Sequence, residues 1–337
     1  MRSLSKNGQR NKYSEHHFLF KEIEDDIKKV GQELKRILTT EDPVLSQTCL
    51  SLFQTEGKWI RPGFTLLSGR FFEYRYERLQ PLAIALELIH MAALIHDDVV
   101  DDSLMRRGQP TLVAGWGVEV SVATGNFLLA KALEQIALLN NNQISALLAQ
   151  VCIEMCKGEI LQLQESYDIK RTFKQYYHCI KRKTALLFSL SCKLGALVSQ
   201  ANKRQIWVLK NFGHWFGIAF QIVDDILDIT ADADVLGKPS KGDLRQGVIT
   251  LPMIYALHNP VYAKRLQVLL SKTEKKENEI KEAVYLIKKA KGVDRAREKA
   301  ELCIEKAIKN LAELPSSPVK DAFIELAYFL GERSYQF

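Results

Sequence analysis

Two stretches of the chain place aspartates at the same spacing just after an apolar run. Residues 96–101 read HDDVVD, and residues 220–228 read FQIVDDILD. In both, the first and the last aspartate are four residues apart and would share one face of a helix. Such like charges repel by about 0.2–0.5 kcal/mol, and the negative end of the helix dipole adds to the cost. The pattern therefore indicates that a cation binds at these helix ends.

The two stretches together supply a set of ligands made only of oxygen atoms. Two helices that face each other would bring six carboxylates around one cavity: Asp97, Asp98, Asp101, Asp224, Asp225 and Asp228. Carboxylate oxygens suit a hard divalent cation, Mg²⁺ above all. Because Mg²⁺ keeps several waters and usually bridges to substrate phosphate, the implied substrate is a diphosphate or polyphosphate ester.

A diphosphate site also requires basic side chains, and several lie near these stretches. The candidates are Lys58 and Arg61 in GKWIRP, Arg106 and Arg107 after the first aspartates, Lys183 beside Thr184 in KRKTALLFSL, and Lys238 in LGKPSKGD. Taken singly, each of these basic residues is more typical of a solvated surface charge. His90, seven residues before Asp97, is by itself more typical of a core histidine.

The elements that must position these residues are helices. Apolar residues recur at intervals of three and four along nearly the whole chain, and alternation with period two is rare. This periodicity and the breaks at proline predict helices at residues 16–38, 44–55, 62–75, 81–102, 117–138, 143–165, 173–199, 204–230, 250–258, 261–270, 275–290, 294–311 and 318–333. No linker rich in Gly, Ser or Pro divides the chain. We therefore expect a disordered basic tail at residues 1–14 and a single all-α domain at residues 15–337.

The composition is that of a globular protein, with 337 residues, 47% of them hydrophobic, and a formal net charge of +7. The basic excess forms no basic-aromatic stripe, which argues against a nucleic-acid partner. The first fourteen residues lack the apolar segment of a signal peptide, and no run of 18 apolar residues predicts an integral membrane protein. The cysteines have neither disulfide nor metal-site spacing, so we expect core thiols in a reducing, cytoplasmic setting. They are Cys49, Cys152, Cys156, Cys179, Cys192 and Cys303.

Five motifs together resemble the trans-isoprenyl diphosphate synthases, also called polyprenyl synthetases. They are GKxxRP at 57–62, HDDxxDxxxxRRGxPT at 96–111, KTALLF at 183–188, FQxxDDxLD at 220–228 and LGKPxxxDLxxG at 236–247. Within the family, the region around the lysine-threonine motif and the stretch TLPMIYAL look most like the catalytic component of bacterial heptaprenyl or hexaprenyl diphosphate synthases.

The resemblance implies an isoprenoid-synthase helical bundle around a deep central cavity, with both aspartate stretches at its mouth. It implies that Mg²⁺ is held by Asp97, Asp101 and Asp224, with Asp98, Asp225 and Asp228 in supporting roles. It assigns the allylic diphosphate to Arg106, Lys183, Gln221 and Lys238, and isopentenyl diphosphate to Lys58, Arg61, His90 and Arg107. The dipoles of Thr184 and Gln221 would stabilise the allylic carbocation, so Lys183, Thr184 and Gln221 are the expected catalytic residues.

Four positions depart from the family pattern: Glu56, Trp59, Asn126 and Val248. None of them removes an expected metal ligand. The loss of basic residues predicts weaker substrate binding by the chain alone. The relatives it most resembles act with a small non-catalytic second chain, so we expect either a homodimer or a heterodimer with such a subunit.

The length of the product depends on the residues one turn before Asp97, which are Ala92 and Ala93. Family members that make short products tend to carry an aromatic ring there. Two alanines therefore imply an open cavity and a long product, hexaprenyl to heptaprenyl, for a quinone side chain. A shorter-chain geranylgeranyl or farnesyl synthase, a terpene cyclase and a non-catalytic regulatory subunit remain as alternatives. The intact second aspartate stretch argues against the cyclase.

Overall fold

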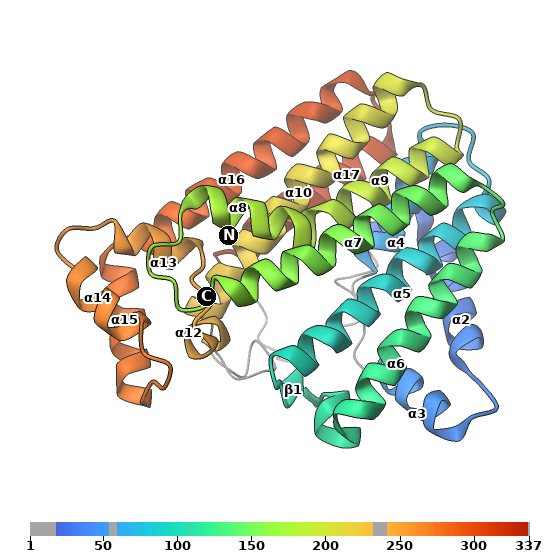
Figure 1. Cartoon of the computed structure of the whole chain (residues 1–337). Coiled ribbons are helices and arrows are strands. Elements are labelled where there is room, and N and C mark those ends of the chain that lie inside the picture. The colour runs from blue at the N-terminus through green and yellow to red at the C-terminus, as the bar shows by residue number, and fades with distance from the viewer. Residues whose placement is uncertain (1–17, 54–58, 107, 232–240, 336–337) are drawn as a thin grey trace, which may run out of the picture.

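The computed structural model describes residues 18–53, 59–106, 108–231 and 241–335. In these residues the chain is a bundle of helices with one two-stranded hairpin, which confirms the expected all-α class (Figure 1). The elements are η1 (Phe18–Ile23), α2 (Glu24–Leu38), α3 (Pro43–Ser51), α4 (Ile60–Arg70), α5 (Tyr76–Val100), β1 (Met105–Arg106), β2 (Gln109–Pro110), α6 (Leu112–Ala137), α7 (Asn142–Gln164), α8 (Phe173–Ile180), η2 (Lys181–Ala185), α9 (Leu186–Val198), α10 (Lys203–Thr230), α12 (Gly242–Gln246), α13 (Leu251–Leu257), α14 (Ala263–Leu270), α15 (Glu277–Lys289), α16 (Gly292–Asn310), η3 (Leu311–Glu313) and α17 (Pro318–Arg333).

The long helices lie side by side with their axes roughly aligned (Figure 1). α10 packs between α9 and α16, α5 packs on α6, and α4 packs on both α5 and α9. A cluster of aromatic rings joins four of these helices at the centre. The ring of Phe64 on α4 lies 4.8 Å from Phe216 on α10, 5.4 Å from Phe323 on α17 and 6.0 Å from Phe188 on α9. This buried apolar contact fixes α10, which carries the second aspartate stretch, and α4, which in turn packs on α5.

Side-chain caps define where several helices begin. Thr111 caps α6, Asn141 caps α7, Thr172 caps α8 and Asn202 caps α10, each through a side-chain oxygen that accepts a backbone N–H of the first turn. In α8 and α10 a glutamine three residues later completes a capping box. Polar residues at these four positions thus stop the preceding segments from joining into longer helices.

Several predicted boundaries are wrong. α5 begins at Tyr76, so Pro81 lies inside the helix instead of at its start. Leu79 and the residues from Leu82 to Leu88 are buried, and this packing outweighs the hydrogen bond lost at the proline. α6 begins at Leu112, before the predicted residue 117, and the left-handed φ of Gly117 kinks it there. The predicted helix at 173–199 is interrupted by η2, and neither the hairpin nor α12 was predicted.

One expectation about the cysteines is also wrong. All six cysteines are free, as expected, and four of them are buried. Cys156 is exposed and Cys152 is only partly buried, because both lie on the outer side of α7. Burial raises the pKa of the Cys152 thiol. The expected cytoplasmic location stays a prediction.

Two helices, α5 and α6, are long and apolar enough to cross a membrane by length and composition alone. The core helix of a folded domain passes the same test, and 61% of the apolar window of α5 is buried inside the bundle. In α6 only 28% of the window is buried, and its outer side exposes Val118 and Leu133. The outer face of α6 is therefore an apolar surface that the described residues do not cover.

Candidate active site

Lys183 and Thr184 lie on η2, a π-helical turn at the centre of the site. π-turns are rare and often mark functional positions, because they interrupt the regular spacing of a helix and re-aim its side chains. α7 and α10 both pack against this turn. A Cβ on Gly158 would lie 2.9 Å from the Lys183 backbone nitrogen, and one on Gly217 would lie 2.6 Å from Ala185 Cα. Glycine at these two positions therefore lets both helices press on η2 and hold it.

Lys183 connects η2 to the first aspartate stretch at the end of α5. Its Nζ lies 2.6 Å from Oε2 of Glu159 on α7 and 3.6 Å from Oδ2 of Asp97. Burial raises the pKa values of Asp97, Asp101 and Glu159, and the Lys183 ammonium opposes that rise. Burial acts to lower the pKa of Lys183, but the neighbouring carboxylates outweigh it, so that pKa is raised. The ammonium is thus kept charged among carboxylates that are costly to ionise.

Asp98 is held by an arginine of the β-hairpin. Nε of Arg106 on β1 lies 2.8 and 3.0 Å from the two oxygens of Asp98, and its Nη2 lies 2.7 Å from Oδ1. Asp98 is buried, and a guanidinium that contacts both carboxylate oxygens forms a strong and directional pair. Asp98 therefore anchors Arg106 and its hairpin to α5, which is a supporting contact within the protein.

Thr184 connects η2 to the second aspartate stretch on α10. Its Oγ1 donates to Oε1 of Gln221 at 2.6 Å, and Nε2 of Gln221 donates to Oδ1 of Asp225 at 3.0 Å. The hydroxyl of Tyr176 on α8 donates to the other Asp225 oxygen at 2.6 Å. Burial raises the pKa of Asp225 to about 7, although the hydrogen bonds from Tyr176 and Gln221 lower it. Asp225 therefore orients Gln221, and Gln221 in turn orients Thr184.

The short helix α12 joins the two aspartate stretches by a second route. The buried carboxylate of Asp228 accepts hydrogen bonds from the backbone N–H groups of Gly242 and Asp243, at 3.1 and 3.2 Å. At the other end of α12, Nε2 of Gln246 donates to the backbone carbonyl of Asp101 at 3.2 Å. The end of α10 is thereby tied to the end of α5.

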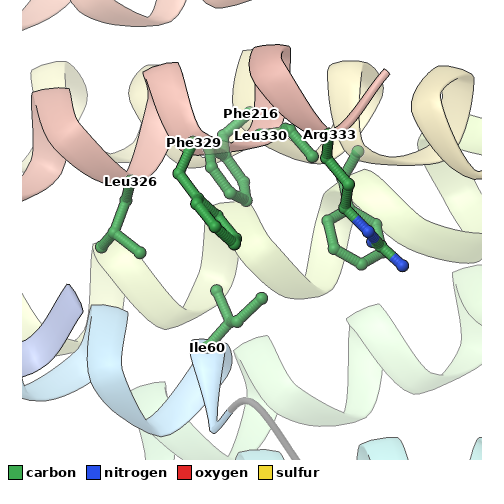
Figure 2. Close-up of a pocket in the computed structure, with 7 residues that line it drawn as sticks. Ile60, Phe216, Leu326, Phe329, Leu330 and Arg333 are labelled. Carbon is green, nitrogen blue, oxygen red and sulfur yellow. The ribbon is translucent and has the colours of Figure 1, made fainter. Parts of the chain in front are cut away.

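The C-terminal helix α17 also reaches the second stretch. Nη1 of Arg333 lies 3.3 Å from Oδ1 of Asp224, whose side chain is 40% exposed. Arg333 also lines a pocket between α17, α10 and the start of α4, where Phe329 and Ile60 point toward one another (Figure 2). The other lining residues are Phe216, Phe220, Leu326 and Leu330. An apolar pocket thus opens beside the second aspartate stretch.

The charges and ligand atoms of this site fit a further cation. Around the end of α5 four carboxylates (Asp97, Asp98, Asp101 and Glu159) face two described basic side chains (Lys183 and Arg106). All the candidate ligand atoms are oxygens, which Mg²⁺ prefers. Within the described ranges no three acidic, histidine or cysteine side chains are gathered closely enough to form a ready-made metal site. Five of the aspartate side chains, those of Asp97, Asp98, Asp224, Asp225 and Asp228, instead contact protein donors.

The six aspartates differ in how firmly protein donors hold them. Both oxygens of Asp98, Asp225 and Asp228 accept hydrogen bonds from protein groups, and all three residues are buried. Asp97 and Asp224 have longer ion pairs, at 3.6 and 3.3 Å, and are more exposed. Asp97 and Asp224 would therefore need a smaller rearrangement to bind a metal than Asp98, Asp225 and Asp228. The metal-binding roles themselves stay predictions.

The residues expected to bind isopentenyl diphosphate are placed only in part. Arg61 is buried at the start of α4, with its guanidinium 4.4 Å from the centre of the Phe188 ring. His90 is partly buried on α5. Lys58 and Arg107 lie outside the described residues, as does Lys238, which was expected to bind the allylic diphosphate. The binding roles of all five stay predictions.

Three of the four positions that depart from the family pattern are described. Trp59 packs against the core, with its ring 6.1 Å from that of Phe53. Val248 is buried, and Asn126 is exposed on α6. Glu56 lies outside the described residues. At position 59 an aromatic side chain therefore adds to the apolar core instead of supplying a charge.

Three residues of the site carried no signal in the sequence. Glu159, Tyr176 and Arg333 belong to none of the five motifs, and each contacts a site residue on another element. The sequence did place a glycine and a glutamate together at 158–159 on a predicted helix. A small residue followed by a charged one is too common to identify a site.

Comparisons with known proteins define the family. The family model for polyprenyl synthetase matches residues 42–287, which is more than half of the chain. Heptaprenyl diphosphate synthase component 2 of Bacillus subtilis is 38% identical over 313 residues, covering 93% of this chain and 89% of that protein. The chain therefore belongs to the polyprenyl synthetase family and is a prenyltransferase.

Solved structures agree with this assignment. Heptaprenyl diphosphate synthase from Staphylococcus aureus superposes with a TM-score of 0.88 and 35% identity, covering 93% of this chain and 98% of that one. A polyprenyl synthase from Caulobacter crescentus, complexed with calcium and isoprenyl diphosphate, superposes with a TM-score of 0.90 and 30% identity, covering 96% and 99%. The fold of this chain is thus the fold of the prenyl synthases.

The hydrogen bond from Tyr176 to Asp225 gives a first prediction. Tyr176→Phe removes the donor and leaves a buried carboxylate oxygen without it, so we expect turnover to fall about tenfold and stability to fall by about 1–3 kcal/mol. The matched control is Tyr177→Phe, because the buried Tyr177 hydroxyl has no hydrogen-bond partner among the residues that the structure describes. Steady-state kinetics and urea unfolding of both variants measure the effects. Equal turnover in the two variants would contradict the role given to Tyr176.

Proposed function

We propose that the chain condenses isopentenyl diphosphate with an allylic diphosphate primer to make a long all-trans prenyl diphosphate, hexaprenyl to heptaprenyl, with Mg²⁺ as cofactor. The observation that carries this proposal is η2, whose Lys183 contacts the first aspartate stretch and whose Thr184 is hydrogen-bonded to the second through Gln221. The relatives support it, because their printed names are those of heptaprenyl diphosphate synthases.

Electrostatic stabilisation of a leaving diphosphate explains this arrangement. A bound divalent cation would neutralise charge on the diphosphate oxygens. Lys183 and Arg106 add fixed positive charge where negative charge develops as the allylic C–O bond breaks and its electron pair leaves with the diphosphate. The oxygen dipoles of Thr184 and Gln221 face the allylic cation. The double bond of isopentenyl diphosphate then forms the new C–C bond, and the departing diphosphate accepts the proton that is lost.

The two alanines before Asp97 differ in their surroundings. Ala92 is fully buried in the core, whereas Ala93 is partly exposed. Ala93 lies four residues before Asp97 and therefore shares its face of α5. The position that faces the growing chain in our proposal is accordingly Ala93, and Ala92 belongs to the helix packing.

A size series at position 93 tests the product length. Ala93→Leu and Ala93→Phe place progressively larger groups one turn below the diphosphate, so we expect the main product to shorten in that order because the cavity closes. Chromatography of the dephosphorylated products gives the chain-length distribution. An unchanged distribution with both variants, each folded by circular dichroism, would contradict a growing chain at this position.

The chain also carries an apolar surface that is suited to binding a second subunit. The outer face of α6, with Val118 and Leu133, is apolar and largely exposed, which is unusual for a chain that acts alone. Two relatives are named as component 2 of a synthase, which supports a partner. We propose a homodimer or a heterodimer with a small non-catalytic chain.

Turnover with isopentenyl diphosphate, a farnesyl diphosphate primer and Mg²⁺, with and without a candidate small subunit, tests the function. We expect longer prenyl diphosphates, made faster when the subunit is present because it completes the apolar face. Chelation of Mg²⁺ should abolish the activity. Release of a hydrocarbon would instead indicate a cyclase. No turnover with either assembly would indicate a regulatory chain.

A further inference from the structure

The carboxylate of Glu159 has a place in the site that the motifs do not assign. α7 crosses η2 at Gly158, where the absence of a side chain lets the two backbones approach closely. This crossing brings the next residue, Glu159, directly against Lys183. The side chains of Lys183 and Glu159 are only 21% and 17% exposed, so their contact is largely shielded from water.

Lys183 lies between two carboxylates but is bonded to one of them. At 2.6 Å the contact from Nζ to Glu159 is a short, charge-assisted hydrogen bond. At 3.6 Å the contact to Asp97 is beyond hydrogen-bond distance and is mainly coulombic. Glu159 is therefore the principal partner of the ammonium group, and Asp97 is a secondary one.

This preference matters because Asp97 is an expected metal ligand. An ammonium group bonded to Asp97 would compete with a divalent cation for the same oxygens. If the charge of Glu159 were removed, the nearest remaining carboxylate for Lys183 would be Asp97. We propose that Glu159 is a positioning residue that holds the Lys183 ammonium away from Asp97, leaving Asp97 available to the metal and the ammonium directed at the diphosphate. The proposal rests on the proposed function in taking a metal-bound diphosphate as the occupant of the site.

The same helix provides a matched control. Glu154 lies about one turn before Glu159 and pairs with Arg182, the neighbour of Lys183, at 2.8 Å. Its side chain is 19% exposed, close to the value for Glu159. Glu154 also pairs with Lys157 on its own helix and contacts neither aspartate stretch in the described structure. Removing this charge therefore disturbs the contact between α7 and η2 but leaves the contact from Lys183 to Glu159 in place.

The test measures binding of inorganic diphosphate at increasing Mg²⁺ concentration by isothermal titration calorimetry, with no turnover. We expect Glu159→Gln to raise the Mg²⁺ concentration at half-saturation about tenfold, the scale of one hydrogen bond to a charged group. Glu159→Asp should restore part of the loss, and Glu154→Gln should bind like the parent chain. In a Lys183→Ala background, Glu159→Gln should have no further effect, since the two residues act through one contact.

Three results would overturn the proposal. They are unchanged Mg²⁺ dependence in Glu159→Gln, an equal loss in Glu154→Gln, and a full effect of Glu159→Gln without Lys183. Circular dichroism confirms that each variant is folded. A parent chain that binds Mg²⁺ and diphosphate as described, but converts no prenyl substrate, would contradict the proposed function and leave the role of Glu159 supported. A parent chain that does not bind them would contradict both.

Discussion

The structure depends on an excess of buried negative charge at the end of α5. Asp97, Asp101 and Glu159 all have pKa values raised by burial, and the Lys183 ammonium opposes the rise in each. Carboxylates in such a place are costly to keep ionised unless cations balance them. The surrounding helices must therefore hold Lys183 in place and leave room for a further cation. The close crossings at Gly158 and Gly217 meet the first requirement.

The two aspartate stretches have the same spacing in the sequence, but their aspartates have two different roles in the structure. Asp98, Asp225 and Asp228 bind the hairpin, the polar network around Gln221, and α12, respectively. These contacts lie within the protein, so one aspartate of the first stretch and two of the second are structural. Some aspartates of the repeated pattern thus have a supporting role, and the hairpin and α12 are two of the short elements that they engage.

The sequence predicted the long helices and the six aspartates because both leave a periodic signal. Helical spacing along α10 and the repeated aspartates are both local patterns. The predicted helix at 204–230 is confirmed by α10, whose apolar residues are buried in the core. The hairpin, α12 and η2 could not be predicted, since each is too short for a periodicity and depends on contacts made from other helices. Glu159 and Tyr176 were missed because their roles depend on contacts between helices. Glu159 acts where α7 packs on η2, and Tyr176 acts where α8 packs on α10. Pro81 was misread because burial of α5 outweighs a local helix-breaking preference.

We propose that a metal-bound diphosphate occupies the space between the two aspartate stretches. Crystals grown with Mn²⁺ and inorganic diphosphate test this proposal, because Mn²⁺ has an anomalous signal. We expect anomalous peaks ligated by Asp97, Asp101 and Asp224, with Lys183 on a diphosphate oxygen. Peaks confined to other carboxylates, or a diphosphate bound away from both stretches, would contradict it.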